Sequence, residues 1–347
     1  MPPPRAGVDR AAWVDHGAGA GRAPGGSAGG ASGALRVFFT TTVAAEPADV
    51  ALLAVALPWY LGRLRIGGDR CMVTVHAPGG GAAHYARAVS ILEAAGVRGH
   101  VRWTSAYSGP AKERVRSSVL LPRFRLEAGD WIVHADSDEF AVIDSDTIFR
   151  ARAAGSNALR GEWTDRVALH GALPEIVENS TAGATVELFA AFPLACALRR
   201  KQKVVAYEFP LRANDGAHGL VQGDEDRAKY AAGPPLTVWH LKWHAHVFDR
   251  LRERVAVKQR LGKVAAAAVT EKILAHLGTH GGVCVDCEAL RGVCCAAPCD
   301  VGALRRYPEF FETAKPRLWT DRGAAAVVLL VVAAVAARRA AHRRRSA

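Results

Sequence analysis

Residues 130–140 read DWIVHADSDEF, and this stretch decides how the rest of the chain is interpreted. Its first half, Trp131–Ala135, has the apolar, β-branched and aromatic composition of a buried strand. Its second half, Asp136–Glu139, places three carboxylates directly after that strand. Such concentrated negative charge is unfavourable unless a cation neutralises it, and carboxylate oxygens are ligands that Mg²⁺ and Mn²⁺ prefer. The stretch therefore predicts a strand that ends at a divalent-cation site; a solvated turn that caps the next helix is the alternative.

The chain before this stretch alternates between predicted strands and predicted helices. The expected strands are Leu35–Val43, Cys71–His76 and Val101–Thr104, and the expected helices are Glu46–Arg65, Ala82–Ala95 and Lys112–Leu126, the last with a break near Pro122. Strands that alternate with helices are typical of an α/β fold with a mostly parallel central sheet flanked by helices. Ligands of such sheets bind beyond the carboxyl ends of the strands, where the acidic residues begin.

The composition divides the chain into four regions. Residues 1–33 are rich in Gly, Ala and Pro and are expected to be disordered. Residues 34–265 form the predicted α/β domain, residues 266–322 a cysteine-rich appendage, and residues 323–347 an apolar segment with a basic tail. The later predicted elements of the domain are the strands Val204–Phe209 and Leu236–Lys242 and the helix His246–Leu261.

The formal net charge of +12 does not point to nucleic acid. The rest of the chain is only mildly basic, because five arginines lie in the last ten residues: Arg338, Arg339, Arg343, Arg344 and Arg345. The sequence has no basic stripe interleaved with aromatic residues that would track a phosphate backbone. We expect no nucleic-acid partner, whereas the mild excess of positive charge suits an anionic nucleotide substrate.

Five cysteines lie close together, at Cys284, Cys287, Cys294, Cys295 and Cys299. Disulfide bonds, which need an oxidising compartment, are the favoured interpretation. A zinc site is an alternative because Cys284 and Cys287 have CxxC spacing, although the adjacent Cys294 and Cys295 fit ordinary zinc spacing poorly. Free thiols are the third possibility.

Residues 324–337 form an unbroken apolar run that is shorter than the roughly 20 residues of a spanning helix. The arginines after it match a cytosolic flank. We therefore predict membrane attachment through this run, with the α/β domain facing the Golgi or ER lumen. A buried or amphipathic helix with a basic tail is the alternative, and residues 1–33 lack the apolar core of a signal peptide.

Two segments resemble a known family. DWIVHADSDEF resembles the nucleotide-sugar motif of GT-A-fold glycosyltransferases, in the broad family-2-like group that includes the family-92-like enzymes. VWHLKWHAHVFDRLRER (238–254) resembles the His-Phe-Lys-Trp segment of that group, with Leu241 in place of Phe. Looser resemblances are GEWTDRVALHG (161–171), AFPLACAL (191–198) and KVVAYEFPLRANDGAH (203–218), so that the resemblance covers roughly residues 35–260.

The resemblance implies a Rossmann-like GT-A domain that uses Mn²⁺ or Mg²⁺ and a nucleotide-sugar donor. Asp136, Asp138 and His240 are the implied metal ligands, and Asp136 is shared with the nucleotide. Lys242 would face the diphosphate, because strand alternation places it on the same face as His240. Thr40 lies at the end of the first strand, where this fold meets the nucleotide; a plain β-branched strand residue is the alternative. A surface patch of histidines is the alternative for His240 and its neighbours.

Three further residues are candidates for catalysis or binding. If the reaction inverts the configuration at the anomeric carbon of the sugar, a base must take the proton of the acceptor hydroxyl. Asp165 is preferred for this role over Glu187 and Asp215. A salt bridge between Asp165 and Arg166 is the alternative. Glu139 joins Asp165 as a catalytic candidate, with an orienting role. His218 would line the donor or acceptor site, although a turn at residues 214–216 explains it equally well.

The sequence therefore predicts a glycosyltransferase that moves a sugar to a glycan, protein or lipid acceptor. A nucleotidyltransferase is the first alternative, but TTTVAAEP (40–47) is not the Gly-rich, basic phosphate loop that it requires. A non-catalytic, membrane-tethered carbohydrate-binding protein is the second alternative. Asp136, Asp138 and His240 argue against it, because all three are intact.

Overall fold

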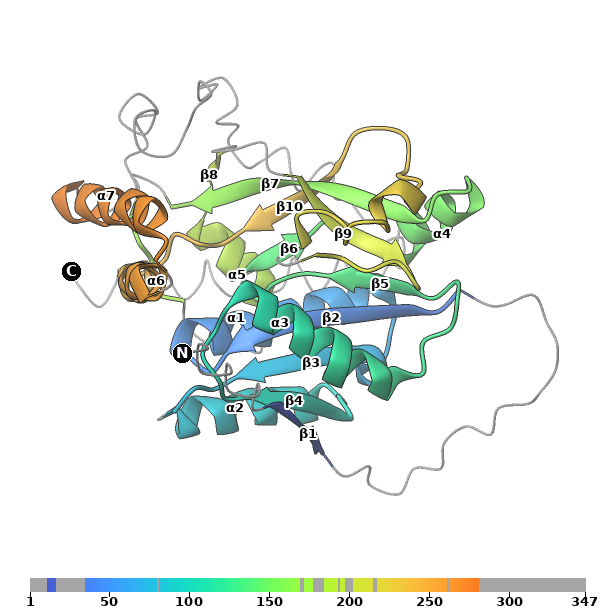
Figure 1. Cartoon of the computed structure of the whole chain (residues 1–347), viewed down its shortest axis with the longest axis horizontal. Helices are drawn as coiled ribbons and strands as arrows, with labels where there is room; N and C mark the ends of the chain where they lie inside the picture. Colours follow the sequence, from blue (N-terminus) through green and yellow to red (C-terminus); the bar gives the residue numbers. More distant parts are fainter. Residues whose placement is uncertain are drawn as a thin grey trace, which may run out of the picture. The chain divides into compact units, whose positions relative to one another are not determined.

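The computed structural model describes residues 11–16, 35–79, 81–168, 172–176, 184–192, 194–196, 202–214, 217–260 and 262–280 (Figure 1). The chain divides into two units, residues 1–304 and residues 305–347, and all described residues belong to the first. The predicted cysteine-rich cluster, the apolar run 324–337 and Asp215 lie outside the described residues. No helix within the described ranges is both long and apolar enough to cross a membrane.

A ten-stranded mixed sheet forms the centre of the domain. Its order is β1-β4-β3-β2-β5-β9-β7-β10-β6, with β8 paired to β7. The strands are β1 (Ala11–Asp15), β2 (Val37–Ala44), β3 (Cys71–His76), β4 (Gly99–Trp103), β5 (Trp131–His134), β6 (Glu139–Ala141), β7 (Ala158–Val167), β8 (Leu194–Cys196), β9 (Gln202–Glu208) and β10 (Leu236–His240). The predicted α/β fold with a central sheet flanked by helices is confirmed.

The two halves of the sheet differ in strand direction. β4, β3, β2 and β5 are parallel neighbours, as the alternating pattern predicted. β9 runs antiparallel to both β5 and β7, β10 is parallel to β7, and β6 is antiparallel to β10. The prediction of a mostly parallel sheet therefore holds for the N-terminal half, and the C-terminal half is mixed.

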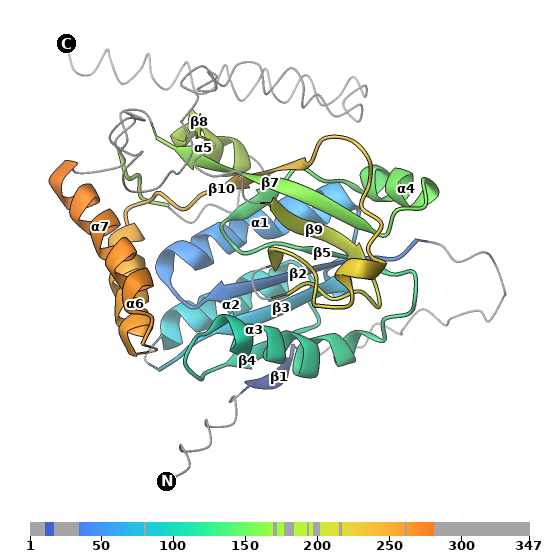
Figure 2. The ribbon, with the colours of Figure 1, turned by 45° about the horizontal axis from the view of Figure 1, so that its top comes forward.

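Helices cover both faces of the sheet (Figures 1 and 2). The α-helices are α1 (Pro47–Leu64), α2 (Ala82–Ala94), α3 (Gly109–Val115), α4 (Ser145–Ala153), α5 (Ala184–Ala191), α6 (Val247–Arg260) and α7 (Val264–His280). Successive strand residues point to opposite faces. Phe39 therefore packs into the core beneath α1 and α2, whereas Phe38 packs into the core beneath α3.

Several boundaries differ from the sequence predictions. Residues 11–15 form β1 within the segment expected to be disordered, because they pair with the edge of β4 and Trp13 packs edge-on against Phe124. β10 ends at His240, two residues early, because the Leu241 N–H donates to the Asp138 carbonyl instead of continuing the ladder. α7 packs against α6 and runs through the boundary placed at residue 265, so the domain extends further than predicted.

A hydrogen-bonded histidine pair joins β1 to the domain. His16 Nε2 lies 2.9 Å from His100 Nδ1, and the Tyr85 hydroxyl lies 2.8 Å from His100 Nε2. His16 Nδ1 lies 3.1 Å from a Glu93 oxygen. Burial lowers the pKa of His100 to about 4, and the nearby His16 and Arg102 lower it in the same direction. His100 is therefore held neutral.

Replacement of His100 by glutamine is expected to flatten the loss of stability in acid. Because the pKa of His100 is lower in the folded state than in the unfolded state, it stabilises the fold above pH 6.5. This contribution is lost as the pH falls from 6.5 through about 4. The free energy of unfolding, measured by urea denaturation across this range, should fall less steeply in His100→Gln. His84→Gln changes an exposed histidine of α2 and should keep the wild-type slope. Equal slopes in all three proteins would contradict this role for His100.

Candidate functional site

A row of three ionisable side chains crosses the C-terminal half of the sheet. β10 lies between β7 and β6, and its last residue, His240, is paired with Asp165 of β7 and with Glu139 of β6. Paired residues on neighbouring strands project to the same face of a sheet. Strand register alone therefore brings together three residues that are far apart in the sequence.

Two features of neighbouring elements hold this row in place. The Tyr60 hydroxyl of α1 donates to the Glu139 carbonyl at 3.0 Å and accepts from the Ala141 N–H at 2.7 Å, which fixes β6. Two valine side chains pack directly against Gly161 of β7. A Cβ added at Gly161 would lie only 2.4 Å from the Val205 side chain and 2.6 Å from the Val238 side chain, so no larger residue fits there without a shift. Glycine at this position allows the strands beside the site to pack closely.

His240 presents a ring nitrogen to each of two carboxylates. Nδ1 lies 2.5 Å from Asp165 Oδ1, and Nε2 lies 3.6 Å from Asp138 Oδ2. The Trp243 indole N–H donates to the other oxygen of Asp165 at 3.1 Å. The Trp163 ring stacks on the His240 ring with centroids 4.8 Å apart and planes 3° from parallel. These contacts fix both the position and the orientation of the imidazole.

The two carboxylates keep His240 protonated. Burial lowers the pKa of His240, but the charges of Asp165 and Asp138 outweigh burial and raise the pKa to about 10. Burial raises the pKa of both carboxyls, and the charge of His240 outweighs it and holds both pKa values below the ordinary range. The three groups thus form one buried ionic unit.

Two buried lysines neutralise the rest of the acidic cluster. Lys203 of β9 lies 2.5 Å from both oxygens of Glu139 and 3.5 Å from Asp136 Oδ2. Lys112 of α3 forms an ion pair with the other oxygen of Asp136. Burial raises the pKa of Asp136, but Lys112 and Lys203 outweigh it and hold the pKa well below its ordinary value. Asp136 is therefore ionised and already has two cationic partners.

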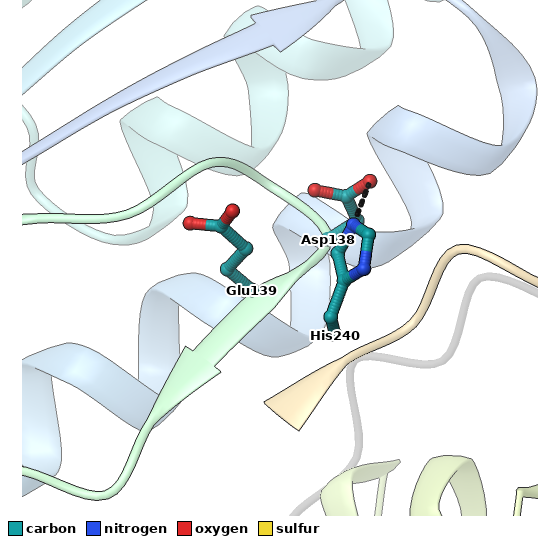
Figure 3. A group of neighbouring side chains, drawn as sticks. All are labelled: Asp138, Glu139 and His240. Carbon is teal, nitrogen blue, oxygen red and sulfur yellow. Dashed lines mark ion pairs between the residues drawn. The ribbon is translucent and has the colours of Figure 1, made fainter. Parts of the chain in front are cut away.

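Asp138, Glu139 and His240 lie close enough together that they could hold a metal ion (Figure 3). One ligand atom from each residue lies within 4.8 Å of the others. Figure 3 shows the His240 ring directed at the Asp138 carboxylate, with the Glu139 carboxylate set to one side. A histidine nitrogen with carboxylate oxygens suits Mn²⁺, and Mg²⁺ when further oxygens are added. The geometry gathers Glu139 into this group in place of the predicted Asp136.

The remaining predicted residues, Thr40, His218 and Lys242, do not belong to this group. Thr40 is buried in β2, and the half-buried Thr42 is the more accessible threonine of that strand. His218 is exposed and meets the Trp163 ring edge-on at 5.1 Å, so it borders the site. Lys242 lies over the Trp243 ring at 4.4 Å. The alternation that paired Lys242 with His240 does not apply, because β10 ends at His240.

The sequence predictions missed the counter-ions of the site. Lys203 is the last of four basic residues in RRKQK (199–203), and the local sequence does not distinguish it from the other three. Lys112 was assigned only to a helix. Arg250 and Asp49 lie in ordinary helical patterns, and only the fold places them within reach of Asp138. Glu187, a weaker base candidate, is exposed on α5.

Comparisons with known proteins give a limited result. No protein-family model matches the chain, and no curated protein matches it. A crystal structure of S. aureus TarS overlaps with 70% of this chain at 8% identity and a TM-score of 0.31, and this chain spans 43% of that one. A structure of TarS 1-349 overlaps with 70% of this chain and 71% of its own at 9% identity and a TM-score of 0.28. Overlap of this extent assigns neither a family nor an activity.

Removal of the Lys203 charge is expected to destabilise the fold severely. Lys203→Met would leave the buried Glu139 carboxylate without its cation, and breaking a buried ion pair on one side costs about 3–5 kcal/mol. The double variant Lys203→Met/Glu139→Gln removes both charges and should recover part of this loss. Urea denaturation of the two single variants and the double variant measures the coupling.

Lys229→Met provides the control, because it removes an exposed lysine. It should change stability by less than about 0.5 kcal/mol. Additive losses in the Lys203 and Glu139 variants would mean that the two charges do not stabilise each other.

Proposed function

We propose that the protein is a glycosyltransferase that uses a nucleotide-sugar donor and a divalent cation. The observation that carries this proposal is the contact between His240 and Asp138. It joins the DSDEF and HLKW segments, which are the two that resemble the GT-A glycosyltransferases, in one buried donor set. The acceptor in this proposal is a glycan, a protein or a lipid.

Asp138 and His240 are the residues assigned to the cation, and His240 Nε2 must release its proton to solvent before it can bind the cation. Asp138 lies in the segment after β5, and His240 is the last residue of β10. A backbone hydrogen bond joins the two segments, because the Leu241 N–H donates to the Asp138 carbonyl at 2.8 Å. A bound Mn²⁺ or Mg²⁺ supplies charge that stabilises the diphosphate as it leaves the sugar. Glu139 is the third candidate ligand, but Lys203 already neutralises its charge. Its first role is therefore to position Asp136, because Glu139 accepts a hydrogen bond of 3.1 Å from the backbone N–H of Asp136.

Asp165 is assigned to holding His240 rather than to taking a proton from the acceptor. One of its oxygens faces His240 Nδ1, and the other accepts from the Trp243 indole. A carboxylate that holds the far nitrogen of a ligand histidine fixes the ring orientation and raises its basicity. This assignment replaces the base role that sequence reasoning preferred for Asp165.

Asp136 is assigned to the donor side of the site. Lys112 and Lys203, both buried, hold its two oxygens, and Asp136 is the partly exposed member of the three next to the cation ligands. The pKa values of both lysines are raised, so both stay protonated behind Asp136 and reduce its repulsion of a phosphate group that approaches this edge. Lysine is suited to such a role as a point charge.

Mn²⁺ together with UDP or GDP is expected to raise the melting temperature of the protein. Ligand at about a hundred times its Kd stabilises the native state by about 2.7 kcal/mol, which corresponds to roughly 5–10 °C for a domain of this size. Asp138→Asn should abolish both this shift and the hydrolysis of the donor sugar. Differential scanning fluorimetry and a nucleotide-release assay measure the two effects.

Asp249→Asn is the matched control, since Asp249 is an exposed carboxylate of α6 that pairs with Arg252. It should retain the shift and the activity. The proposal fails if no pairing of Mn²⁺ or Mg²⁺ with a nucleotide stabilises the wild-type protein.

Asp165→Asn separates the holding role from the base role. If Asp165 holds His240, the variant should bind Mn²⁺ about 10–100-fold more weakly. If Asp165 is instead the base, Mn²⁺ affinity should be unchanged while turnover is lost. Isothermal titration with Mn²⁺, followed by turnover measured at saturating Mn²⁺, distinguishes the two results.

A further inference from the structure

Helix α6 brings a guanidinium to the carboxylate that is assigned to the cation. Arg250 Nη1 lies 3.6 Å from Asp138 Oδ2, and Arg250 Nη2 lies 3.3 Å from Asp49 Oδ1. The same Nη1 lies 3.4 Å from Nε2 of the buried His244. Arginine suits this position because its planar fork reaches two carboxylates and it stays charged at any working pH.

Asp49 fixes the guanidinium in place. It lies in the first turn of α1 with a side chain that is only 2% exposed, and it also accepts a hydrogen bond from the Ser137 hydroxyl at 2.8 Å. Asp49 therefore holds both Arg250 and the residue next to Asp138. Helix α1, the acidic segment and helix α6 meet at this one carboxylate.

The contacts produce a line of ionisable side chains. Asp49, Arg250, Asp138, His240 and Asp165 contact one another in this order, and Arg250 carries the permanent positive charge between two carboxylates. Asp138 lies at the centre, with the Arg250 guanidinium on one side and the His240 ring on the other. A divalent cation on Asp138 would stand beside the Arg250 charge, which does not titrate away, and the two cations would repel each other.

We propose that Arg250 is a positioning residue that holds Asp138 when no metal is bound and competes with a divalent cation for its carboxylate. Arg250 thereby sets the affinity of the site for the cation, an inference that rests on the proposed function for the assignment of Asp138 as a ligand. Cation binding and the contact between α6 and the acidic segment are then coupled, because the cation displaces the Arg250 side chain of α6 from the Asp138 carboxylate.

Manganese titration of the full chain tests the competition without reference to turnover. Free Mn²⁺ is measured by electron paramagnetic resonance. Arg250→Met is expected to bind Mn²⁺ about tenfold more tightly than wild type, which corresponds to about 1.4 kcal/mol. Arg252→Met removes an exposed arginine of the same helix and should leave the affinity unchanged. A merely structural role for Arg250 would weaken Mn²⁺ binding, or leave it unchanged, when Arg250 is removed.

A second pair of variants decides the question if Arg250→Met does not fold. Asp49→Asn removes the partner that Arg250→Met would leave buried, so Asp49→Asn/Arg250→Met carries no unpaired charge from this pair. The double variant should bind Mn²⁺ about tenfold more tightly than Asp49→Asn alone. Circular dichroism melts show which variants are folded.

The outcomes separate this inference from the proposed function. If wild type binds Mn²⁺ and the removal of Arg250 leaves the affinity equal or lower in the folded variants, the competition is refuted and the proposed function stands. If neither wild type nor any folded variant binds Mn²⁺, the competition is refuted, and the thermal shift with Mn²⁺ or Mg²⁺ and a nucleotide decides the proposed function separately. Tighter binding on removal of Arg250 that is lost on adding Asp138→Asn supports the inference at the proposed carboxylate.

Discussion

Charge that is buried in a protein must be neutralised by opposite charge or by hydrogen bonds, and this constraint organises the C-terminal half of the domain. Two ionic sets meet there. In the first, the carboxylates of Asp138 and Asp165 enclose His240, and Asp49 and Arg250 extend the line. The second consists of Lys112, Asp136, Lys203 and Glu139. Each charge depends on its neighbours, so the stability of this half and its chemistry share the same residues.

The two halves of the sheet divide the work of building this site. The parallel half supplies a rigid platform with an apolar core on each face, and it ends at β5, from which the acidic segment leaves. The mixed half aligns the side chains of the site, because β10 lies between β7 and β6. The strand register places His240 opposite Asp165 on one side and Glu139 on the other. A parallel sheet of the simple alternating kind would not place Glu139 and Asp165 on either side of one histidine.

The secondary-structure predictions rested on the periodic pattern of apolar residues. They failed where polar residues interrupt that pattern or where tertiary folding alone brings residues together. β3 was predicted with its observed bounds, because six buried residues end at Pro78 and glycine. The strand β7 was missed because its half-buried, mostly polar residues 162–165 interrupt the apolar pattern. Asp138 and His240 were predicted as neighbours from a resemblance. Their counter-ions Lys203 and Arg250 come from separate elements, and partners made by tertiary folding leave no pattern in local sequence.

The strand β1 has a consequence for how the protein behaves in solution. It lies along the outer side of β4, where the parallel half would otherwise present a row of unpaired backbone N–H and C=O groups. At the opposite end of the sheet, β6 is only three residues long, which leaves little backbone for another chain to pair with. Residues 11–16 therefore cover the edge of β4. A protein that lost them by proteolysis would expose that edge to backbone pairing with another copy of the chain.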